Sequence, residues 1–113
     1  MPTFESGVVV RVPFPYTDRP VRQFRPALVV AAPGPAGGAN LLWVLMITSA
    51  RNRPWPDDVE IPPRESGPGL PAPSVVRTRK IATIDVHHAE PIGRIDAATL
   101  GRVRAIVKAY LGF

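Results

Sequence analysis

The sequence predicts a mainly β protein, a small and strongly bent β-barrel that carries one helix at its C-terminal end. Several short runs of β-branched and apolar residues alternate with turn-forming segments, as they do in all-β domains. Most of the 15 prolines gather between these runs, where they suit shaped loops and exclude a helical bundle. Apolar residues recur at helical spacing near the end of the chain.

The predicted strands are short. Their ranges are Gly7–Val12, Arg25–Ala32, Leu41–Ser49, Val59–Ile61, Ser74–Arg77 and Lys80–Asp85. The second and third strands are apolar on both faces, which places them in the centre of the sheet. The last two can also form one bent strand. Five or six strands are too few for two packed sheets, so an SH3-like barrel is favoured over a sandwich.

The helix is predicted over Ala97–Leu111. Its apolar positions are Leu100, Val103, Ile106, Val107, Tyr110 and Leu111. Asp96 is a favourable N-cap, and Ile95 before it can pack on Leu100 as a hydrophobic staple. The sequence leaves open whether this apolar stripe covers the barrel or forms a dimer interface.

Length and charge indicate one domain, residues 1–113, with an anionic partner. The net charge is +5, and 12 arginines stand against 2 lysines. Such a surplus favours nucleic acid as the partner, although the arginine usage of a high-GC genome explains it equally well.

Cysteine is absent, so the chain has no disulfide framework and no thiolate metal site. No apolar run approaches the ~20 residues that span a bilayer, and the first residues lack the features of a signal peptide. We therefore expect a soluble, cytoplasmic protein without membrane association. No cluster of ligand residues points to a metal or another cofactor.

Two of the strands bring polar side chains to one end of the sheet. Arg25 begins one strand and Thr48 ends the next, and the Pro/Gly-rich segment 33–40 joins them. If this connection is symmetric, facing residues of the antiparallel pair have numbers that sum to 73, and Arg25 lies opposite Thr48. A guanidinium beside a hydroxyl at the rim of a sheet is a candidate phosphate site.

Several short motifs follow one another from Gly7 to the final helix. They are Gly7-Val8-Val9-Val10, Phe14-Pro15-Tyr16-Thr17-Asp18, Arg25-Pro26-Ala27-Leu28-Val29-Val30, Ile47-Thr48-Ser49, Gly69-Leu70, Ser74-Val75-Val76-Arg77 and Thr83-Ile84-Asp85. In this order and spacing they resemble the MazF/PemK/Kid family, the toxins of bacterial toxin–antitoxin pairs.

The resemblance implies a barrel of the CcdB/MazF/PemK type, a homodimer, and metal-independent cleavage of single-stranded RNA at short sequence motifs. It also implies a cognate antitoxin whose acidic, amphipathic C-terminal tail blocks the site. The key arginine of the family falls on Arg25, the key hydroxyl on Thr48, and a further arginine on Arg77. Two acidic positions found in some members are replaced here by Arg79 and Pro20, which leaves Asp18 as the nearest carboxylate in its loop.

The chemistry of metal-free RNA cleavage suits these residue types. Arg25 can offset the charge of a crowded phosphorane, Thr48 can add a neutral donor, and Arg77 a second cation. Arginine is a poor base, so the base is Asp18, a histidine, or nothing strong. The alternative roles are structural: Arg25 as a surface cation, Thr48 as an ordinary strand residue, and Arg77 as the partner of Asp85 or Glu90.

Two basic loops are candidates for RNA contacts. The first spans residues 14–24, and the second spans Ala50–Asp57. The candidate residues are Tyr16, Arg19 and Arg22 in the first loop, Arg51, Arg53 and Trp55 in the second, and Ser49 and Arg79 beside them. Trp55 can stack an unpaired base or fold back as cover for the barrel, and we expect Trp43 in the core. His87 and His88 are expected to be structural or solvent-facing.

Two other functions fit the same fold. One is a non-catalytic toxin that inhibits a protein target such as gyrase, as CcdB proteins do. The other is a plain RNA-binding SH3-like module. Arg25 with Thr48 and the basic loops favour RNA cleavage over both.

Overall fold

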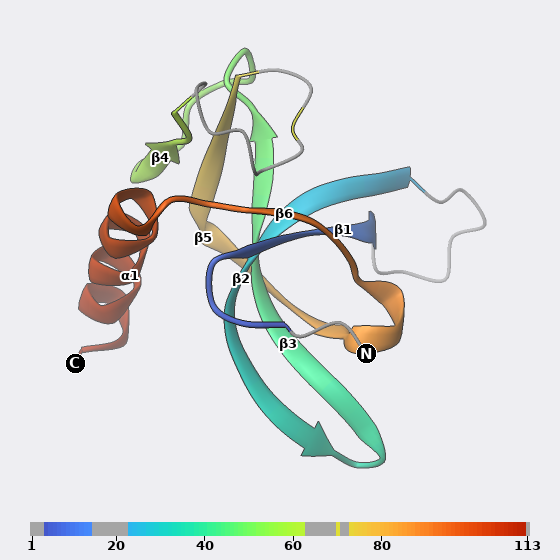
Figure 1. The fold of residues 1–113 in the computed structure, drawn as a ribbon. Coiled ribbons are helices and arrows are strands. Elements are labelled where there is room, and N and C mark those ends of the chain that lie inside the picture. Colours follow the sequence, from blue (N-terminus) through green and yellow to red (C-terminus); the bar gives the residue numbers. More distant parts are fainter. Residues whose placement is uncertain (1–3, 15–22, 63–69, 71–72, 113) are drawn as a thin grey trace.

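A computed structural model describes residues 4–14, 23–62, 70 and 73–112 of the chain. In this part the chain forms one antiparallel six-stranded sheet with the strand order β4-β5-β3-β2-β1-β6, followed by a helix (Figure 1). The elements are β1 (Val8–Phe14), β2 (Gln23–Ala36), β3 (Ala39–Ser49), β4 (Asp58–Glu60), β5 (Ser74–Asp85), the 3₁₀ turn η1 (Val86–His88), β6 (Glu90–Arg94) and α1 (Ala97–Leu111). The predicted mainly β fold with one C-terminal helix is confirmed.

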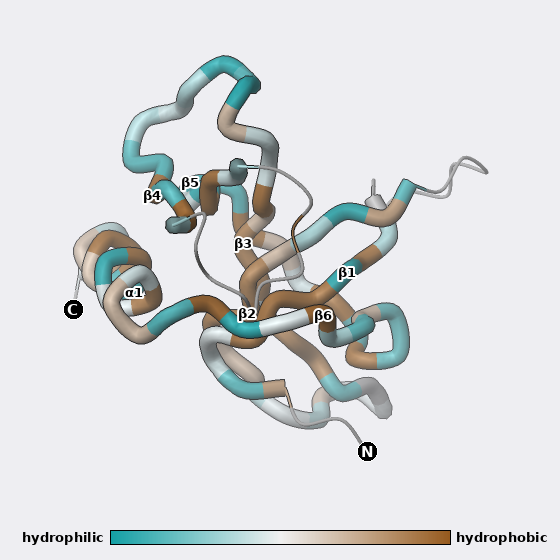
Figure 2. The backbone as a smooth tube through the Cα atoms, turned by 45° about the horizontal axis from the view of Figure 1, so that its top comes forward, coloured by the Kyte–Doolittle hydropathy of each residue, from teal (hydrophilic) through white to brown (hydrophobic). Residues whose placement is uncertain are grey.

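The sheet is buried on both faces, because alternate residues of its central strands enter two different apolar clusters. Val10, Val29 and Val44 belong to the first cluster. Leu28 and Leu45 belong to the second, where the helix contributes Val103. The continuous apolar runs of β2 and β3 therefore mark central strands, as predicted. Figure 2 shows these strands as brown segments in the middle of the molecule.

The β2–β3 hairpin is longer than the sequence predicts. The segment expected as a loop, residues 33–40, is mostly strand, and only Gly37 and Gly38 form the turn between Ala36 and Ala39. Both glycines have positive φ angles, 58° and 85°, which a type I′ hairpin turn requires and which glycine adopts without steric cost. Next to the turn, paired residues such as Pro35 and Asn40 have numbers that sum to 75.

Two irregularities between Val29 and Gly34 then remove this two-residue offset. Farther from the turn, Ala27 pairs with Met46 and Leu28 with Leu45, so the numbers sum to 73. The register predicted from a symmetric loop is therefore correct near the polar end of the hairpin, although the loop itself was placed wrongly. Bulges of this kind also bend the strands, which helps a small sheet to curve.

Strand β5 is the single bent strand that the sequence allowed, because its pairing with β3 shifts between Leu45 and Ile47. The helix has the predicted bounds, and the Asp96 carboxylate accepts a hydrogen bond of 3.0 Å from the Thr99 backbone N–H. Strand β6 was not predicted. Its sequence Glu-Pro-Ile-Gly-Arg lacks the usual strand pattern, and its pairing with β1 defines it.

Trp43 is not in the core as predicted. It has 45% of its surface exposed, although its neighbours Leu42 and Val44 on β3 are buried. Trp43 pairs with Thr83 on the hairpin side of β3, and in Figure 1 this hairpin extends away from α1. The sequence of an apolar strand shows which residues share a face of the sheet. It does not show how far along that face the covering helix reaches, and this is why the exposure of Trp43 was not predicted.

His87 and His88 are both exposed, as predicted, but they lie in η1 and not in a strand. The Asp85 carboxylate accepts a hydrogen bond of 2.9 Å from the His87 backbone N–H, and this bond keeps the pKa of Asp85 below its usual value. Within the described residues, no helix combines the length and the apolar character needed to cross a bilayer.

Candidate functional site

A pocket of about 350 Å³ opens where β2, β3 and β5 meet the loop of residues 50–57. Its lining residues are Arg25, Met46, Ile47, Thr48, Asn52, Arg53, Trp55, Arg77 and Lys80. The structure thus brings together five candidates from the sequence: Arg25, Thr48, Arg53, Trp55 and Arg77. Figure 2 shows the 50–57 loop, between β3 and β4, in mostly hydrophilic colours.

The charge of this pocket has one sign. Four of its described lining residues are cations, namely Arg25, Arg53, Arg77 and Lys80, and none of the described lining residues is acidic. Clustered cations around a concave surface raise the local concentration of anions. The pocket is therefore suited to a phosphate-bearing ligand.

Arg25 lies at the exposed start of β2. Its Nη2 donates a hydrogen bond of 3.0 Å to Oε1 of Gln23, the residue that shares its face of the strand. In β1 its partner is Val12, which is fully buried, so the backbone below Arg25 is fixed by the core. A rigid main chain thus carries a guanidinium that reaches solvent.

Thr48 is the second-last residue of β3 and also lines the pocket. Its hydroxyl accepts a hydrogen bond from the Asn52 side-chain amide, 2.5 Å away. A hydroxyl that accepts a bond still has its own proton to donate, so Thr48 can donate to a ligand. Asn52 was not among the candidates, because a polar residue in a turn gives no sign in the sequence that it reaches back to a strand.

Arg77 is nearly buried, with 7% of its surface exposed. Its Nη2 donates a hydrogen bond of 2.9 Å to the backbone carbonyl of Arg53. The guanidinium carbon lies 4.4 Å from the centre of the Trp55 ring, which is a cation–π contact. Asp85 and Glu90, the structural partners considered for Arg77, pair with His87 and Arg11 instead.

Trp55 folds back onto the protein, which was one of the two roles considered for it. One side of its ring covers Arg77, and Lys80 Nζ lies 5.9 Å from the ring centre. The side chain nevertheless keeps 41% of its surface exposed at the pocket. The Asp58 carboxylate accepts a hydrogen bond of 3.0 Å from the Trp55 backbone N–H, which fixes the residue within its loop.

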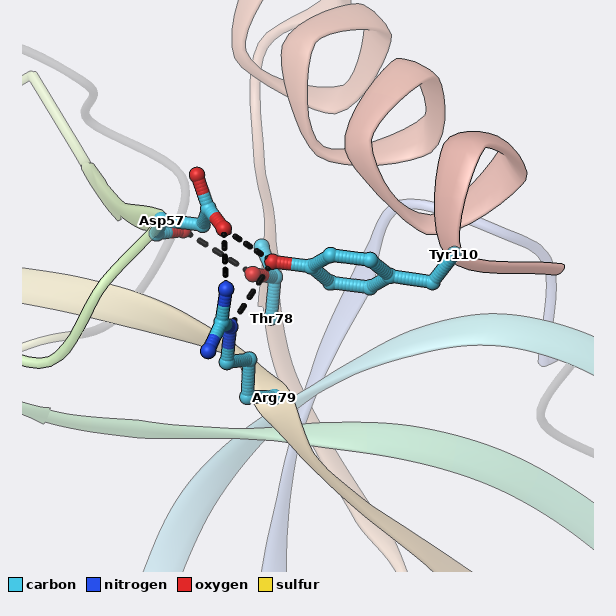
Figure 3. A network of polar contacts seen from close by, with 4 residues as sticks. All are labelled: Asp57, Thr78, Arg79 and Tyr110. Carbon is cyan, nitrogen blue, oxygen red and sulfur yellow. Dashed lines mark hydrogen bonds and ion pairs between the residues drawn. The ribbon is translucent and has the colours of Figure 1, made fainter. Parts of the chain in front are cut away.

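Ser49, Arg51 and Arg79 do not line this pocket. Ser49 Oγ accepts a hydrogen bond of 3.2 Å from the Arg51 backbone N–H and so shapes the turn after β3. Arg79 forms an ion pair of 3.1 Å with Asp57 and donates a 3.0 Å hydrogen bond to the Tyr110 hydroxyl (Figure 3). Its guanidinium is therefore engaged on the side of the sheet that faces α1.

Four candidates from the first basic loop, Tyr16, Asp18, Arg19 and Arg22, lie outside the described residues. Lys80 and Asn52 are additional pocket residues that sequence reasoning missed. Lys80 stood in a predicted strand, and nothing in the sequence showed that the bend of β5 turns it toward Trp55. Among the described residues, no three His, Asp or Glu side chains gather as a metal site would require.

The molecule is thus a small β protein with one bent antiparallel sheet and a cationic pocket at the strand ends. Residues 5–111 match the family described as the PemK-like, MazF-like toxins of type II toxin–antitoxin systems. Because this match spans nearly the whole chain, the protein belongs to that family. No curated protein sequence matches the chain.

Solved structures agree with the family. MazF from Deinococcus radiodurans is 24% identical, with a TM-score of 0.71 and 96% of both chains covered. A MazE–MazF structure from the same organism is 25% identical, with a TM-score of 0.71 and the same coverage. An endoribonuclease in complex with its cognate antitoxin from a mycobacterial species is 19% identical, with a TM-score of 0.68 and coverage of 95% and 93%. The predicted barrel of the MazF/PemK type is confirmed.

Proposed function

We propose that this toxin is a metal-independent endoribonuclease that cleaves single-stranded RNA at short sequence motifs. The observation that carries the proposal is the pocket itself. Four cations and a threonine hydroxyl surround it, and no described lining residue is acidic. A phosphodiester and its more highly charged transition state both fit such a site.

The reaction is attack of a ribose 2′-oxygen on the neighbouring phosphorus. The 2′-OH gives up its proton as the 2′-O–P bond forms, the P–O5′ bond breaks, and the leaving 5′ oxygen takes up a proton from Arg25 or solvent. The products are a 2′,3′-cyclic phosphate and a 5′-hydroxyl. Arg25 grips two phosphate oxygens through its fork as negative charge accumulates on them. Thr48, from the neighbouring strand, donates its hydroxyl proton as a hydrogen bond to the phosphate.

Arg77 serves differently, because its guanidinium is already held by the Arg53 carbonyl and the Trp55 ring. It supplies a fixed positive charge beneath the phosphate, and a fixed charge requires no reorganisation during the reaction. The candidate for accepting the 2′-OH proton is Asp18, which lies outside the described residues; the alternatives are a histidine or no strong base. Replacement of Asp18 by asparagine tests this role, since it leaves RNA binding in place and removes the base.

The remaining RNA contacts come from the two loops. Trp55 offers its exposed surface to an unpaired base, and a base–aromatic stack contributes about 1–3 kcal/mol. Arg51 and Arg53 attract the backbone from the second loop, and Tyr16, Arg19 and Arg22 from the first. Ser49 supports this end of β3 by shaping the turn that precedes Arg53.

The partners follow from the same features. A cationic pocket suits the acidic C-terminal tail of a cognate antitoxin, and two of the similar solved structures hold a toxin with its antitoxin. Homodimerisation is supported by exposed apolar side chains beside α1, including Ile81 at 59% and Leu111 at 63% exposure. We place the protein in the cytoplasm, where mRNA is its substrate.

One assay separates this function from the two alternatives. The purified protein is incubated with a long single-stranded RNA in the presence of EDTA. Discrete fragments ending in cyclic phosphate are expected. Intact RNA that migrates as a complex would instead indicate a plain RNA-binding module, and RNA that is neither cut nor bound would indicate a toxin with a protein target.

A further inference from the structure

The loop of residues 50–57 carries three lining residues of the pocket, and three consecutive residues of β5 hold it. Arg77 donates to the Arg53 carbonyl at 2.9 Å. The Thr78 hydroxyl donates to the Asp57 carbonyl, also at 2.9 Å. Arg79 donates to the Asp57 carboxylate at 3.1 Å. The second half of the loop is therefore attached to β5 at both of its ends.

Asp57 is the last residue before β4, and its backbone has a φ angle of 64°. Among the described residues, Asp57 is the single non-glycine residue with a positive φ. Aspartate and asparagine tolerate this conformation better than most residues do, but surrounding contacts must still select it. The chain direction at Asp57 decides where the preceding Trp55 points.

The Asp57 side chain connects the loop to the helix as well as to β5. Its carboxylate accepts hydrogen bonds from Arg79 and from the Tyr110 hydroxyl, and that hydroxyl accepts a bond of 3.0 Å from Arg79 Nε (Figure 3). The three groups close a ring of mutual contacts. Tyr110 and then Arg79 lower the pKa of Asp57 from its usual value, so the carboxylate is ionised at neutral pH.

We propose that Asp57, Arg79 and Tyr110 form a positioning triad, which holds the 50–57 loop so that Trp55 and Arg53 face RNA in the pocket. This inference rests on the proposed function. All three are positioning residues, because none of them lines the pocket of Arg25 and Thr48. Arg79 thereby acts through Asp57 and not by touching RNA.

The energetics explain why such a triad affects binding more than folding. Its side chains are exposed, and exposed ion pairs add little to global stability. Without the triad the loop keeps its backbone bonds to Arg77 and Thr78 but loses its side-chain link to α1, which lets it populate other conformations. The apparent dissociation constant for RNA then rises as the fraction of correctly placed loop falls.

The test compares two exposed arginine–carboxylate pairs in a Trp43→Phe background, where Trp55 is the remaining tryptophan of the two in the sequence. Asp57→Asn weakens the triad and keeps a residue that tolerates positive φ. Glu90→Gln is the matched control, since it removes the carboxylate of the 3.0 Å pair with Arg11. Tyr110→Phe is a second triad variant, which removes the hydroxyl and keeps the ring.

Two readouts are measured on each variant, together with its melting temperature. Acrylamide quenching of Trp55 fluorescence should increase in Asp57→Asn and Tyr110→Phe but not in Glu90→Gln. The KM for RNA cleavage should rise about 3- to 10-fold in the two triad variants, the range expected for one lost hydrogen bond, while kcat stays within about twofold. Melting temperatures should change little.

Equal quenching and equal KM in all three variants would overturn the proposal. A fall in kcat with an unchanged KM would also contradict it, because that pattern belongs to a group acting on the reacting atoms. Fluorescence quenching requires no RNA. If the parent protein cleaves no RNA, the proposed function fails, and quenching still decides whether the triad holds the loop.

Discussion

Two arginines in one pocket are held in opposite ways. Arg25 is exposed at the start of β2 and donates a hydrogen bond to the flexible side chain of Gln23. Arg77 has 7% exposure and lies between the Arg53 carbonyl and the Trp55 ring. The first guanidinium can follow a phosphate as it reacts, whereas the second is part of the folded framework.

In the proposed mechanism, this difference separates a reacting group, Arg25, from a supporting charge, Arg77. An exposed cation at a strand end contributes little to folding, so its replacement should affect the reaction alone. A buried guanidinium that satisfies a backbone carbonyl contributes to both folding and function. Measuring stability and cleavage together on matched variants therefore tests the distinction.

The largest expected effect is that of Arg25→Ala on cleavage. Loss of one well-aimed donor to a charged transition state lowers the rate about 10²- to 10³-fold. The free energy of unfolding should stay within about 0.5 kcal/mol of the parent value, because Arg25 is exposed. Single-turnover cleavage of a defined RNA and thermal melting give the two numbers.

Arg94→Ala is the control for net charge. Arg94 is also exposed, and it pairs with Glu5 at 3.1 Å outside the pocket. If Arg25 acts by its position, Arg94→Ala cleaves normally. Similar losses in both variants would show that the total charge of the protein, and not the guanidinium in the pocket, governs the reaction.

Arg77→Met is expected to reduce stability and cleavage together. The substitution leaves the Arg53 carbonyl without its donor and removes the cation under Trp55, so unfolding should become easier by about 1–3 kcal/mol. Cleavage should fall at least tenfold even at temperatures where the variant is folded. A stable but inactive Arg77→Met would place Arg77 with Arg25 as a directly reacting group, and the contrast between them would disappear.

Trp55→Ala is next in size. If a base stacks on the exposed face of the ring, RNA affinity falls by about 1–3 kcal/mol, roughly 5- to 150-fold, while kcat at saturating RNA changes less. Fluorescence anisotropy of a labelled RNA measures the affinity, with 2′-O-methylated RNA used because it lacks the attacking 2′-hydroxyl and is not cleaved. Normal affinity combined with a lower melting temperature would show that Trp55 acts only as cover for Arg77.

The fold was largely predictable because its signals are local. Apolar runs identified β2 and β3 as central strands, and helical spacing with Asp96 as N-cap gave the bounds of α1. The register at the polar end of the hairpin was also correct. Strand β6 was missed because pairing with β1, and not its own composition, makes it a strand.

The site was predictable in three strand residues and in Arg53 and Trp55 of the second basic loop. Arg25, Thr48 and Arg77 share one pocket; the symmetry of the connecting loop suggested the first two, and the family resemblance suggested Arg77. The contacts that organise the pocket come from bends and turns. The bend of β5 sends Arg77 and Lys80 to Trp55 and Arg79 to Asp57, and no residue pattern in the sequence encodes that separation.

The smallest expected effect is that of the helix cap, which should change stability without changing cleavage in the pocket. Asp96→Ala removes the N-cap of α1 and should lower the free energy of unfolding by about 1 kcal/mol at pH 7, while cleavage stays normal because α1 begins outside the pocket. Asp96→Asn should retain most of the stability, since asparagine also caps helices.

Acid titration adds a second check on the same cap. Hydrogen bonds from Thr99, its side chain first, keep the pKa of Asp96 below the ordinary value of 3.8. A depressed pKa means that the carboxylate stabilises the fold fully above pH 3.8 and loses this contribution as pH falls through the lower folded-state pKa. The stability difference between the parent and Asp96→Ala should therefore shrink in that acidic range. Asparagine does not titrate, so the stability difference between Asp96→Asn and Asp96→Ala should stay the same at every pH.

The cleavage assay gives the result that would contradict this view. If cleavage fell with Asp96→Ala as it does with Arg25→Ala, the start of the helix would belong to the functional machinery, and the distinction between supporting and reacting groups would be wrong.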